Sequence, residues 1–254
     1  MIKTVFITGA SSGIGYACAE TFARRGYKLI LNARRKERLR EISQHLRKQF
    51  DIEVLELVFD VRNRKAVFEA VASIPEEFSQ IDMLINNAGL ALGLSSWQDG
   101  DMDDWDQMID TNVKGLLYVS KAVAPVMIRR KSGHIINIGS IAGRETYPNG
   151  NVYCATKHAV ASITKAMRIE LVSYGIKVSQ VSPGATETEF SMVRFKGDKE
   201  KAKSVYKGYD PLTAEDIAAC VEFCSQLPPH VNIDDMLVMP TAQAAAGIFH
   251  KRKD

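Results

Sequence analysis

The chain alternates short apolar runs with helical segments from end to end. Seven runs rich in apolar and β-branched residues predict strands, at Thr4–Thr8, Lys28–Ala33, Glu53–Val58, Met83–Asn86, His134–Ile138, Lys177–Ser182 and Met236–Met239. Helical periodicity fills the gaps, at Tyr16–Arg25, Lys36–Gln49, Arg64–Ile74, Trp105–Arg130, Asn151–Tyr174 and Ala214–Gln226. Such alternation predicts an α/β fold, with a doubly wound, seven-stranded parallel sheet and helices on both faces.

The composition is that of an ordinary folded domain. Of the 254 residues, 46% are hydrophobic and 25% are charged, and the formal net charge is +3. No linker, repeat or low-complexity segment divides the chain, so we expect a single domain over residues 1–254. The small net charge argues against binding to nucleic acid or to a membrane surface.

Metal binding and membrane insertion are not expected. The four cysteines lie in helical patterns, and the five histidines show no paired-ligand spacing, so no metal is predicted. A strand that begins at Thr4 is incompatible with a secretory signal peptide, and no apolar run approaches the ~20 residues of a membrane span. These features favour a cytoplasmic protein.

A tyrosine and a lysine four residues apart carry the most chemical information. Tyr153 and Lys157 lie in a helical segment, where this spacing brings two Cβ atoms to about 6 Å on one face. A free tyrosine has a pKa of about 10, and an ammonium group beside it favours the phenolate. Such a pair can exchange a proton with an alcohol or a carbonyl near neutral pH. Because one such pair can arise by accident, the other motifs decide its meaning.

A glycine-rich turn follows the first strand. Gly9, Gly13 and Gly15 stand between the strand Thr4–Thr8 and the helix Tyr16–Arg25. Glycine permits a tight turn and a close approach of the backbone, and a helix N-terminus presents free N–H groups to an anion. The spacing Gly-x3-Gly-x-Gly differs from the Gly-x-Gly-x2-Gly fingerprint of many dinucleotide sites. Strand, turn and helix together still predict a phosphate cradle.

The ordered motifs of the chain resemble the short-chain dehydrogenase/reductase superfamily. They are Thr8-Gly9-x3-Gly13-Ile14-Gly15, Asn86-Asn87-Ala88-Gly89, Asn112, Ser140, Tyr153-x3-Lys157 and Pro183-Gly184-x3-Thr188. The match runs from residue 4 to about residue 240. This resemblance implies a Rossmann-like fold with a cofactor-binding half at about 1–130. The catalytic half, with a substrate lid, would occupy about 131–254.

The end of the second strand indicates the cofactor. In dinucleotide-binding folds an acidic residue near this point binds the ribose 2′-hydroxyl of NAD, whereas arginine accommodates the 2′-phosphate of NADP. Here the strand ends in Asn32-Ala33-Arg34-Arg35, with no acidic residue before Glu37. A guanidinium group can bind a phosphate through two parallel hydrogen bonds. We therefore predict NADP(H), with Arg34 as the main ligand and Arg35 in support, although both could simply open a solvated basic helix.

The resemblance implies the remaining cofactor contacts. Asp60-Val61 corresponds to an adenine-binding site, where the aspartate could equally cap the next helix. The backbone of 87–89 would lie under the cofactor ribose, although Asn87 could equally tie neighbouring strands together. Pro183-Gly184 and Thr188 would contact the nicotinamide carboxamide. The expected cofactor-binding residues are Gly9, Ser11, Ser12, Gly13, Ile14, Gly15, Arg34, Arg35, Asp60, Val61, Asn87, Ala88, Gly89, Tyr153, Lys157, Pro183, Gly184 and Thr188.

The same resemblance implies the catalytic residues Asn112, Ser140, Tyr153 and Lys157. Tyr153 would act as acid or base on the substrate oxygen, while Ser140 would hydrogen-bond and polarise that oxygen. Lys157 would lower the tyrosine pKa and bind the nicotinamide ribose. Asn112, in a kinked helix, would hold a water that relays protons to the lysine. Without such a role it would be an exposed helix asparagine.

The later part of the chain is similar to one group within the superfamily. Glu189–Asp198, Leu212–Asp216, Leu227–Ile233 and Met239–Gln243 resemble the NADP-dependent 3-hydroxy acid dehydrogenases, which include serine and L-allo-threonine dehydrogenases of bacteria and yeast. The similarity implies oxidation of the 3-hydroxyl of a small hydroxy acid, such as 3-hydroxypropanoate. The loop 185–187 is one residue shorter than its counterpart in that group, which leaves the substrate preference open.

A carboxylate substrate requires a cation other than the catalytic lysine. Arg194 and Lys196 lie in the expected lid after Gly184, and Arg144 lies just beyond Ser140. We prefer Arg194 as the substrate ligand and keep Arg144 as a second candidate. The alternative for Arg194 is a solvated lid charge.

Two other functions and the assembly remain open from the sequence. One alternative is an NADPH-dependent reductase of another small ketone or aldehyde. An acyl-carrier substrate is disfavoured, because the last strand leads into Pro240–Gln243 rather than a glycine-rich ending. A remote alternative is a non-catalytic NADP-binding sensor, although all four catalytic positions are filled. The resemblance also implies a homotetramer or homodimer, with helices 105–130 and 151–174 between subunits and the apolar segment 242–249 at an interface.

Overall fold

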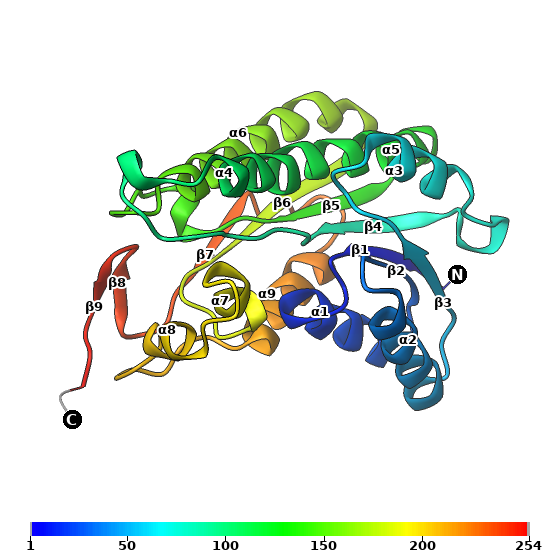
Figure 1. Ribbon diagram of the computed structural model, residues 1–254. Helices are drawn as coiled ribbons and strands as arrows, with labels where there is room; N and C mark the ends of the chain where they lie inside the picture. Colours follow the sequence, from blue (N-terminus) through cyan, green and yellow to red (C-terminus); the bar gives the residue numbers. More distant parts are fainter. Residues whose placement is uncertain (1, 253–254) are drawn as a thin grey trace.

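Seven parallel strands form the centre of the molecule in the computed structural model, which describes residues 2–252 (Figure 1). The strands are β1 (Thr4–Thr8), β2 (Lys28–Ala33), β3 (Val54–Val58), β4 (Ile81–Asn86), β5 (Gly133–Ile138), β6 (Ile176–Pro183) and β7 (Asp235–Val238). Their order in the sheet is β3-β2-β1-β4-β5-β6-β7, and each neighbouring pair is parallel. The order reverses between β1 and β4, which is where ligands bind in open α/β sheets. The predicted fold class is confirmed.

Helices cover both faces of the sheet (Figure 1). One layer consists of α1 (Gly13–Arg24), α2 (Lys36–Phe50) and α9 (Ala214–Gln226). The opposite layer includes α3 (Arg64–Ala72), α5 (Leu116–Arg130) and α6 (Asn151–Leu171). Alternation along β1 divides the core, because Val5 and Ile7 pack with the first layer and Phe6 packs with the second. The fully buried strands therefore read as continuous apolar runs.

The segment expected to be one helix, 105–130, is interrupted. α4 (Met102–Ile109) is capped by Asp101, whose side chain accepts from the backbone N–H groups of the first turn. A π-helical turn, Asp110–Gly115, follows and leads into α5. At its end, a Cβ on Gly115 would lie 2.7 Å from a methyl group of Val61. The kink is therefore present as a π turn, which rotates the side chains within it relative to a regular helix.

The chain also contains short elements that periodicity cannot reveal. They are α7 (Glu189–Arg194), α8 (Lys199–Ser204), the antiparallel hairpin of β8 (Gln243–Ala245) and β9 (Ile248–Phe249), and the 3-10 turns Glu76–Phe78, Trp97–Asp99, Ile141–Gly143 and Val172–Tyr174. Figure 1 places α7 and α8 next to each other, and the red hairpin apart from the main sheet. Helices of three to six residues and strands of two or three residues span too few turns or alternations to give a sequence signal.

Residues 2–252 contain no helix long and apolar enough to cross a membrane. The same residues contain no group of three or more His, Cys, Asp or Glu side chains suited to a metal ion. The four cysteines are free thiols. Cys18 of α1 and Cys224 of α9 are buried in the core between these helices and the sheet. Their sulfur atoms therefore contribute to packing.

Candidate active site

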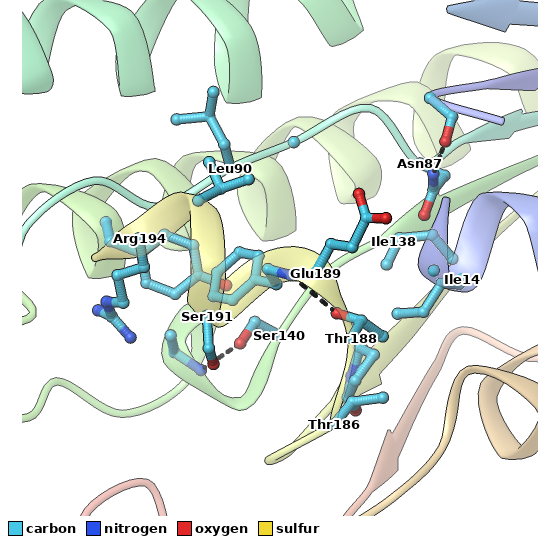
Figure 2. Close-up of a pocket in the computed structure, with 18 of the residues that line it drawn as sticks. Ile14, Asn87, Leu90, Ile138, Ser140, Thr186, Thr188, Glu189, Ser191 and Arg194 are labelled. Atoms are coloured by element: carbon cyan, nitrogen blue, oxygen red, sulfur yellow. Dashed lines mark hydrogen bonds between the residues drawn. The ribbon is translucent and has the colours of Figure 1, made fainter. Parts of the chain in front are cut away.

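A cavity of about 590 Å³ lies at the carboxyl ends of the strands (Figure 2). This size and position are typical of a ligand site in an open α/β sheet. The residues predicted to be functional that line it are Gly9, Ser11, Ser12, Gly13, Ile14, Arg34, Arg35, Asp60, Val61, Asn87, Ala88, Gly89, Ser140, Tyr153, Lys157, Pro183, Gly184, Thr188 and Arg194. Gly15, Asn112 and Arg144 lie outside the lining.

The glycine-rich turn between β1 and α1 forms one wall of the cavity. Gly9 and Gly13 have φ angles of +65° and +52°, in the left-handed region that glycine adopts without strain. Gly15 lies behind this wall, where an added Cβ would meet Nδ2 of Asn87 and the carbonyl oxygen of Gly9 at 2.4 Å. The first turn of α1 directs its free N–H groups to this wall, as a phosphate cradle requires.

Asn87 ties the ends of β1 and β4 together. Its Nδ2 donates to the carbonyl oxygens of Thr8 and Gly9 at 3.0 and 3.1 Å. The backbone N–H groups of Asn87 and Ala88 both donate to the Thr8 hydroxyl at 3.0 Å. Asn87 thus has the structural role that the sequence left open, which is to tie neighbouring strands together. It holds the backbone of 87–89 in place along the cavity.

Arg34 and Arg35 follow β2 at the mouth of the cavity, and both side chains are about half exposed. Nη1 of Arg34 lies 3.8 Å from Oδ2 of Asp60. Nη2 of Arg35 donates to the hydroxyls of Ser11 and Ser12 at 3.1 and 3.2 Å. Two guanidinium groups therefore stand beside the phosphate cradle, where they can bind a second anionic group.

Asp60 is held by Arg62 and does not cap α3. The guanidinium of Arg62 donates to Oδ2 of Asp60 at 2.7 Å, and its backbone N–H donates to Oδ1 at 2.9 Å. The cap of α3 is Asn63, whose Oδ1 accepts from the N–H of Ala66 at 3.1 Å. Although burial alone would raise the pKa of Asp60, the hydrogen bonds from Arg62 hold it below its usual value. A charged carboxylate thus borders the cavity, and the capping alternative is wrong.

Tyr153 and Lys157 lie one turn apart on α6, and both line the cavity. Nζ of Lys157 donates to the carbonyl oxygen of Ile138 at 2.9 Å, and burial lowers the pKa of Lys157 to about 8. Ser140 follows β5, where its Oγ accepts from the N–H of Ala142 at 3.1 Å and is hydrogen-bonded to the Tyr153 phenol. The predicted tyrosine, lysine and serine are therefore gathered in one part of the cavity.

Burial is the main influence on the pKa of Tyr153, and it raises that pKa. The neighbouring Tyr147 acts in the same direction, whereas the hydrogen bond with Ser140 and the guanidinium of Arg194 lower it. Lys157 was expected to lower this pKa, but its ammonium is bound to a carbonyl oxygen of β5. The phenol of Tyr153 consequently remains protonated near neutral pH, in the form that donates a proton.

Asn112 lies behind the cavity with only 2% of its surface exposed. Its Oδ1 accepts from the N–H of Leu90 at 2.8 Å, and its Nδ2 donates to the carbonyl oxygen of Leu90 at 2.8 Å and to Oγ1 of Thr156 at 3.0 Å. The alternative of an exposed helix asparagine is therefore wrong. The π turn brings this side chain inward, where it joins the segment after β4 to α6.

The lid segment, residues 184–213 between β6 and α9, covers the cavity from the opposite side and carries Arg194 at the end of α7. Nη2 of Arg194 donates to the Tyr147 hydroxyl at 2.7 Å, and Nε donates to the carbonyl oxygen of Gly93 at 3.3 Å. The guanidinium lies 5.3 Å from the ring centre of Tyr153 and 5.6 Å from that of Tyr147. A cation thus stands directly beside the tyrosine that was predicted to be the acid or base.

The model of the short chain dehydrogenase family matches residues 3–199. The chain belongs to this family. The match contains the glycine-rich turn, Ser140, Tyr153 and Lys157 of the dehydrogenase, together with the first half of its lid segment.

Relatives of the dehydrogenase share nearly its whole length. It is 46% identical to an NADP-dependent 3-hydroxy acid dehydrogenase of Schizosaccharomyces pombe, over 99% of this chain and 97% of the relative. It is 44% identical to sulfoacetaldehyde reductase 2 of Chromohalobacter salexigens, over 96% of each chain. Among solved structures, the closed form of a serine dehydrogenase complexed with NADP+ superposes with a TM-score of 0.91 at 44% identity, over 98% of this chain and 100% of that one.

The structure does not bring Arg144 of the dehydrogenase to the cavity. Its Nη2 lies 2.7 Å from Oδ2 of Asp235, whose other oxygen accepts from Ser182 at 2.7 Å. Lys196 is likewise engaged away from the cavity, 2.9 Å from Oδ1 of Asp104. Of the candidate cations for a substrate carboxylate, Arg194 alone lines the cavity. The second assignment, to Arg144, is therefore corrected.

Sequence reasoning missed three side chains of the site. Tyr147 holds the guanidinium of Arg194, Phe190 packs against Tyr153 with ring centres 5.6 Å apart, and Glu189 lies where the lid meets the start of α2. Tyr147 and Phe190 are ordinary loop and helix residues whose roles depend on what packs against them. Glu189 could have been noticed as an acid next to Thr188, but nothing in the sequence connects it with distant arginines.

Proposed function

We propose that this dehydrogenase uses NADP(H) to oxidise, reversibly, the 3-hydroxyl of small 3-hydroxy acids such as serine, L-allo-threonine and 3-hydroxypropanoate. The observation that carries the proposal is the guanidinium of Arg194, which stands 5.3 Å from the ring centre of Tyr153 inside the cavity. A cation that packs against the ring of the proton donor suits a substrate that bears a hydroxyl and an anionic group a few bonds apart. The 46% identical relative acts on substrates of this kind by its name.

The residues around the cavity fit NADP(H). The glycine turn and the N-terminus of α1 suit a pyrophosphate, and the half-exposed Arg34 and Arg35 suit a 2′-phosphate. The hydrogen bonds of Arg35 to Ser11 and Ser12 direct it toward the cradle, which favours this role over that of a solvated helix start. NADP(H), when bound, supplies the hydride chemistry. We propose that Lys157 holds its ribose and that Pro183, Gly184 and Thr188 hold its nicotinamide end.

Each proposed catalytic residue has a distinct task. The phenol of Tyr153 gives a proton to the substrate oxygen in reduction, and the phenolate takes that proton back in oxidation. The hydroxyl of Ser140, already hydrogen-bonded to that phenol, binds the same oxygen and polarises it. The buried ammonium of Lys157 has a pKa of about 8, so it can exchange a proton near neutral pH. It thereby helps to restore the protonation state of Tyr153 after each reaction. The side chain of Asn112 holds the backbone of Leu90 in place. We propose that the backbone of Asn112 binds the water that relays protons to Lys157.

Arg194 is the proposed ligand of the substrate carboxylate. The guanidinium has five N–H donors, of which the structure uses one for Tyr147 and one for the carbonyl oxygen of Gly93. The remaining donors match the two oxygens of a carboxylate. The rings of Tyr147 and Tyr153 flank the guanidinium and favour its charge. A small acid bound in this way presents its 3-hydroxyl to the phenol.

A second candidate function is the reduction of a small aldehyde that carries a sulfonate. A relative named sulfoacetaldehyde reductase 2 is 44% identical over 96% of the chain. Arg194 suits a sulfonate as well as a carboxylate, because both present several oxygens that share one negative charge. Ala185 and Thr186 of the loop 185–187 in the lid segment line the cavity, and we propose that this loop distinguishes the two substrate classes.

We further propose a homotetramer or homodimer located in the cytoplasm. Large apolar side chains are exposed on the helices that the family resemblance assigns to subunit contacts: Ile169 is 75% exposed and Val172 67%. In the C-terminal hairpin Ile248 is 64% exposed. Contiguous exposed apolar side chains favour an interface over solvent.

The first experiment follows reduction of NADP+ by absorbance with L-serine, L-allo-threonine and 3-hydroxypropanoate. NAD+ replaces NADP+ in parallel, and sulfoacetaldehyde with NADPH tests the reverse reaction. Turnover of the hydroxy acids with a strong preference for NADP+ is expected. Faster turnover of sulfoacetaldehyde than of any hydroxy acid would favour the second function. Binding of NADPH without turnover of either class would contradict both functions and favour the sensor.

A further inference from the structure

Glu189, the first residue of α7, joins the lid segment to the arginines at the start of α2. Its Oε1 lies 2.5 Å from Nη2 of Arg38. Its Oε2 lies 3.3 Å from both terminal nitrogens of Arg35. The same Nη2 of Arg35 donates to the hydroxyls of Ser11 and Ser12 in the glycine-rich turn. The carboxylate therefore bridges an arginine that lines the cavity, Arg35, and one that does not, Arg38.

This carboxylate carries its charge at neutral pH. Although partial burial would raise the pKa of Glu189, Arg38 and Arg35 together hold it below its usual value. The negative charge stands at Arg35, one of the two guanidinium groups that we assign to the 2′-phosphate, and it uses both terminal nitrogens of that group. A phosphate monoester has a charge of about −1.5 to −2 at pH 7, so it cannot share Arg35 with a carboxylate without repulsion.

We propose that Glu189 is an internal competitor of the cofactor 2′-phosphate for Arg35, and that Arg38 retains the carboxylate when the phosphate binds. The inference rests on the proposed NADP function. The two oxygens of Glu189 make it possible, because Oε1 already belongs to Arg38 and only Oε2 must be released. Glu189 thereby limits affinity for nucleotides that carry the 2′-phosphate and leaves affinity for those without it unchanged.

The position of Glu189 connects the two ends of the site. Glu189 and Arg194 are the first and last residues of α7, and Figure 2 shows them at opposite ends of this helix. Five helical steps place their Cα atoms about 7.5 Å apart along the helix axis. Release of Glu189 from Arg35 therefore occurs on the same rigid element that carries the proposed substrate ligand.

The test is calorimetric titration of the full chain with two nucleotides that lack nicotinamide, adenosine 2′,5′-bisphosphate and adenosine 5′-monophosphate. Glu189→Gln should bind the bisphosphate roughly tenfold more tightly, since a carboxylate about 5 Å from a phosphate dianion repels it by that factor in a high dielectric. Its affinity for the monophosphate should stay within about twofold, which also verifies that the cradle is folded. The gain should shrink at high salt.

Glu187→Gln is the matched control, because this exposed glutamate lies two residues earlier in the same lid segment. It removes an equal charge from the lid, and the affinity for the bisphosphate should change by less than about twofold. An equal gain in both variants would overturn the competition, since it would reflect net charge alone. An unchanged or weaker affinity of Glu189→Gln for the bisphosphate would also overturn it.

The role of Arg38 is tested by a double-mutant cycle. Arg38→Gln should weaken bisphosphate binding more strongly in the wild-type background than in Glu189→Gln, because the freed carboxylate then binds Arg35 with both oxygens. Equal losses in the two backgrounds would contradict this role. If the wild type binds the bisphosphate no more tightly than the monophosphate, the proposed NADP specificity fails and the inference fails with it. A clear preference in the wild type that Glu189→Gln leaves unchanged refutes only the inference.

Discussion

The two sides of the cavity are built differently. On the strand side, hydrogen bonds fix the strand ends. In the core, Nδ2 of Asn86 donates to Ser120 of α5 and to Asn137 of β5 at 2.8 and 2.9 Å, and the partly buried Asn87 joins β4 to β1. On the lid side, short helices are joined to the rest of the molecule by long, partly exposed side chains, such as those of Glu189 and Arg38. Buried hydrogen bonds contribute more to stability than exposed ion pairs do.

The proposed catalytic groups and the residues proposed to set substrate and cofactor preference therefore lie on different sides of the cavity. The strand side and α6 carry the proposed acid, its serine partner and the cofactor cradle, whose geometry must not change between substrates. The lid segment carries Arg194, the proposed ligand of the substrate carboxylate, and Glu189, the proposed competitor of the 2′-phosphate. Substrate and cofactor preference can therefore change through the lid without disturbing the reacting groups.

The largest expected effect is on the strand side, at Tyr153. Tyr153→Phe keeps the ring in its contacts with Phe190 and Arg194 but removes the proton donor. We expect kcat for L-serine oxidation to fall by about 10²–10⁴-fold, with NADPH binding and thermal stability nearly unchanged. Steady-state kinetics and fluorescence titration of NADPH measure both. A variant that retained more than a tenth of wild-type kcat would exclude Tyr153 as the acid or base.

Lys157 should have the next effect, both on activity and on the pH dependence of stability. Lys157→Met is expected to lower kcat/KM by roughly 10²–10³-fold, because proton transfer to and from Tyr153 loses its partner. Burial lowers the pKa of Lys157 to about 8 in the folded protein, whereas an exposed lysine has about 10.4. Between these values the unfolded chain binds a proton that the folded protein has lost, so this group makes the free energy of unfolding rise with pH.

Denaturant unfolding of wild type and Lys157→Met at pH 7, 8, 9 and 10 measures this linkage. The free energy of unfolding of the wild type minus that of the variant should increase from about pH 8 upward and stay constant below it. A difference that remains flat up to pH 10 would show that Lys157 has an ordinary pKa.

For the lid segment we expect a loss of activity that depends on the substrate, in contrast to the general loss expected at Tyr153 and Lys157. Arg194→Leu should lower kcat/KM for L-serine by about 10²-fold, since a charged hydrogen bond to the carboxylate is lost. Turnover of a neutral alcohol should fall much less, because there only the influence of Arg194 on the pKa of Tyr153 is lost. Arg144→Leu is the control, because Arg144 pairs with Asp235 away from the cavity. It should keep kcat/KM within about twofold and cost at most ~1 kcal/mol of stability. Equal losses on the charged and the neutral substrate would remove Arg194 as the carboxylate ligand.

The smallest expected effect concerns the rigidity of the strand side. Asn87→Ala removes the side-chain hydrogen bonds to the carbonyl oxygens of Thr8 and Gly9. The free energy of unfolding should fall by about 1–3 kcal/mol, more than in Glu189→Gln, whose partners are half exposed. Urea denaturation of the two variants compares the two sides of the cavity directly. A larger loss in Glu189→Gln would reverse the proposed order of rigidity.

Local patterns were sufficient to predict most of the fold. β1 and β2 begin and end at the predicted residues, and α9 does so too, because each has a run of apolar or periodic residues bounded by turn residues. A kink within 105–130 was expected from the family resemblance and not from periodicity, and neither indicated the π turn that the structure has there. The short α7 and α8 gave no signal, since helices of six residues present less than two turns.

The sequence by itself determined the order of strands and helices along the chain, the strand ends at which the glycine turn and Ser140 lie, and the helix that carries Tyr153. These depend on local periodicity and on residues close together in the chain. Only the tertiary structure decided that Arg194 faces Tyr153 while Arg144 pairs with Asp235, 91 residues away, and that Glu189 contacts Arg35, 154 residues away. Which charges meet across such separations depends on how the lid folds back over the sheet, and no local pattern encodes that path.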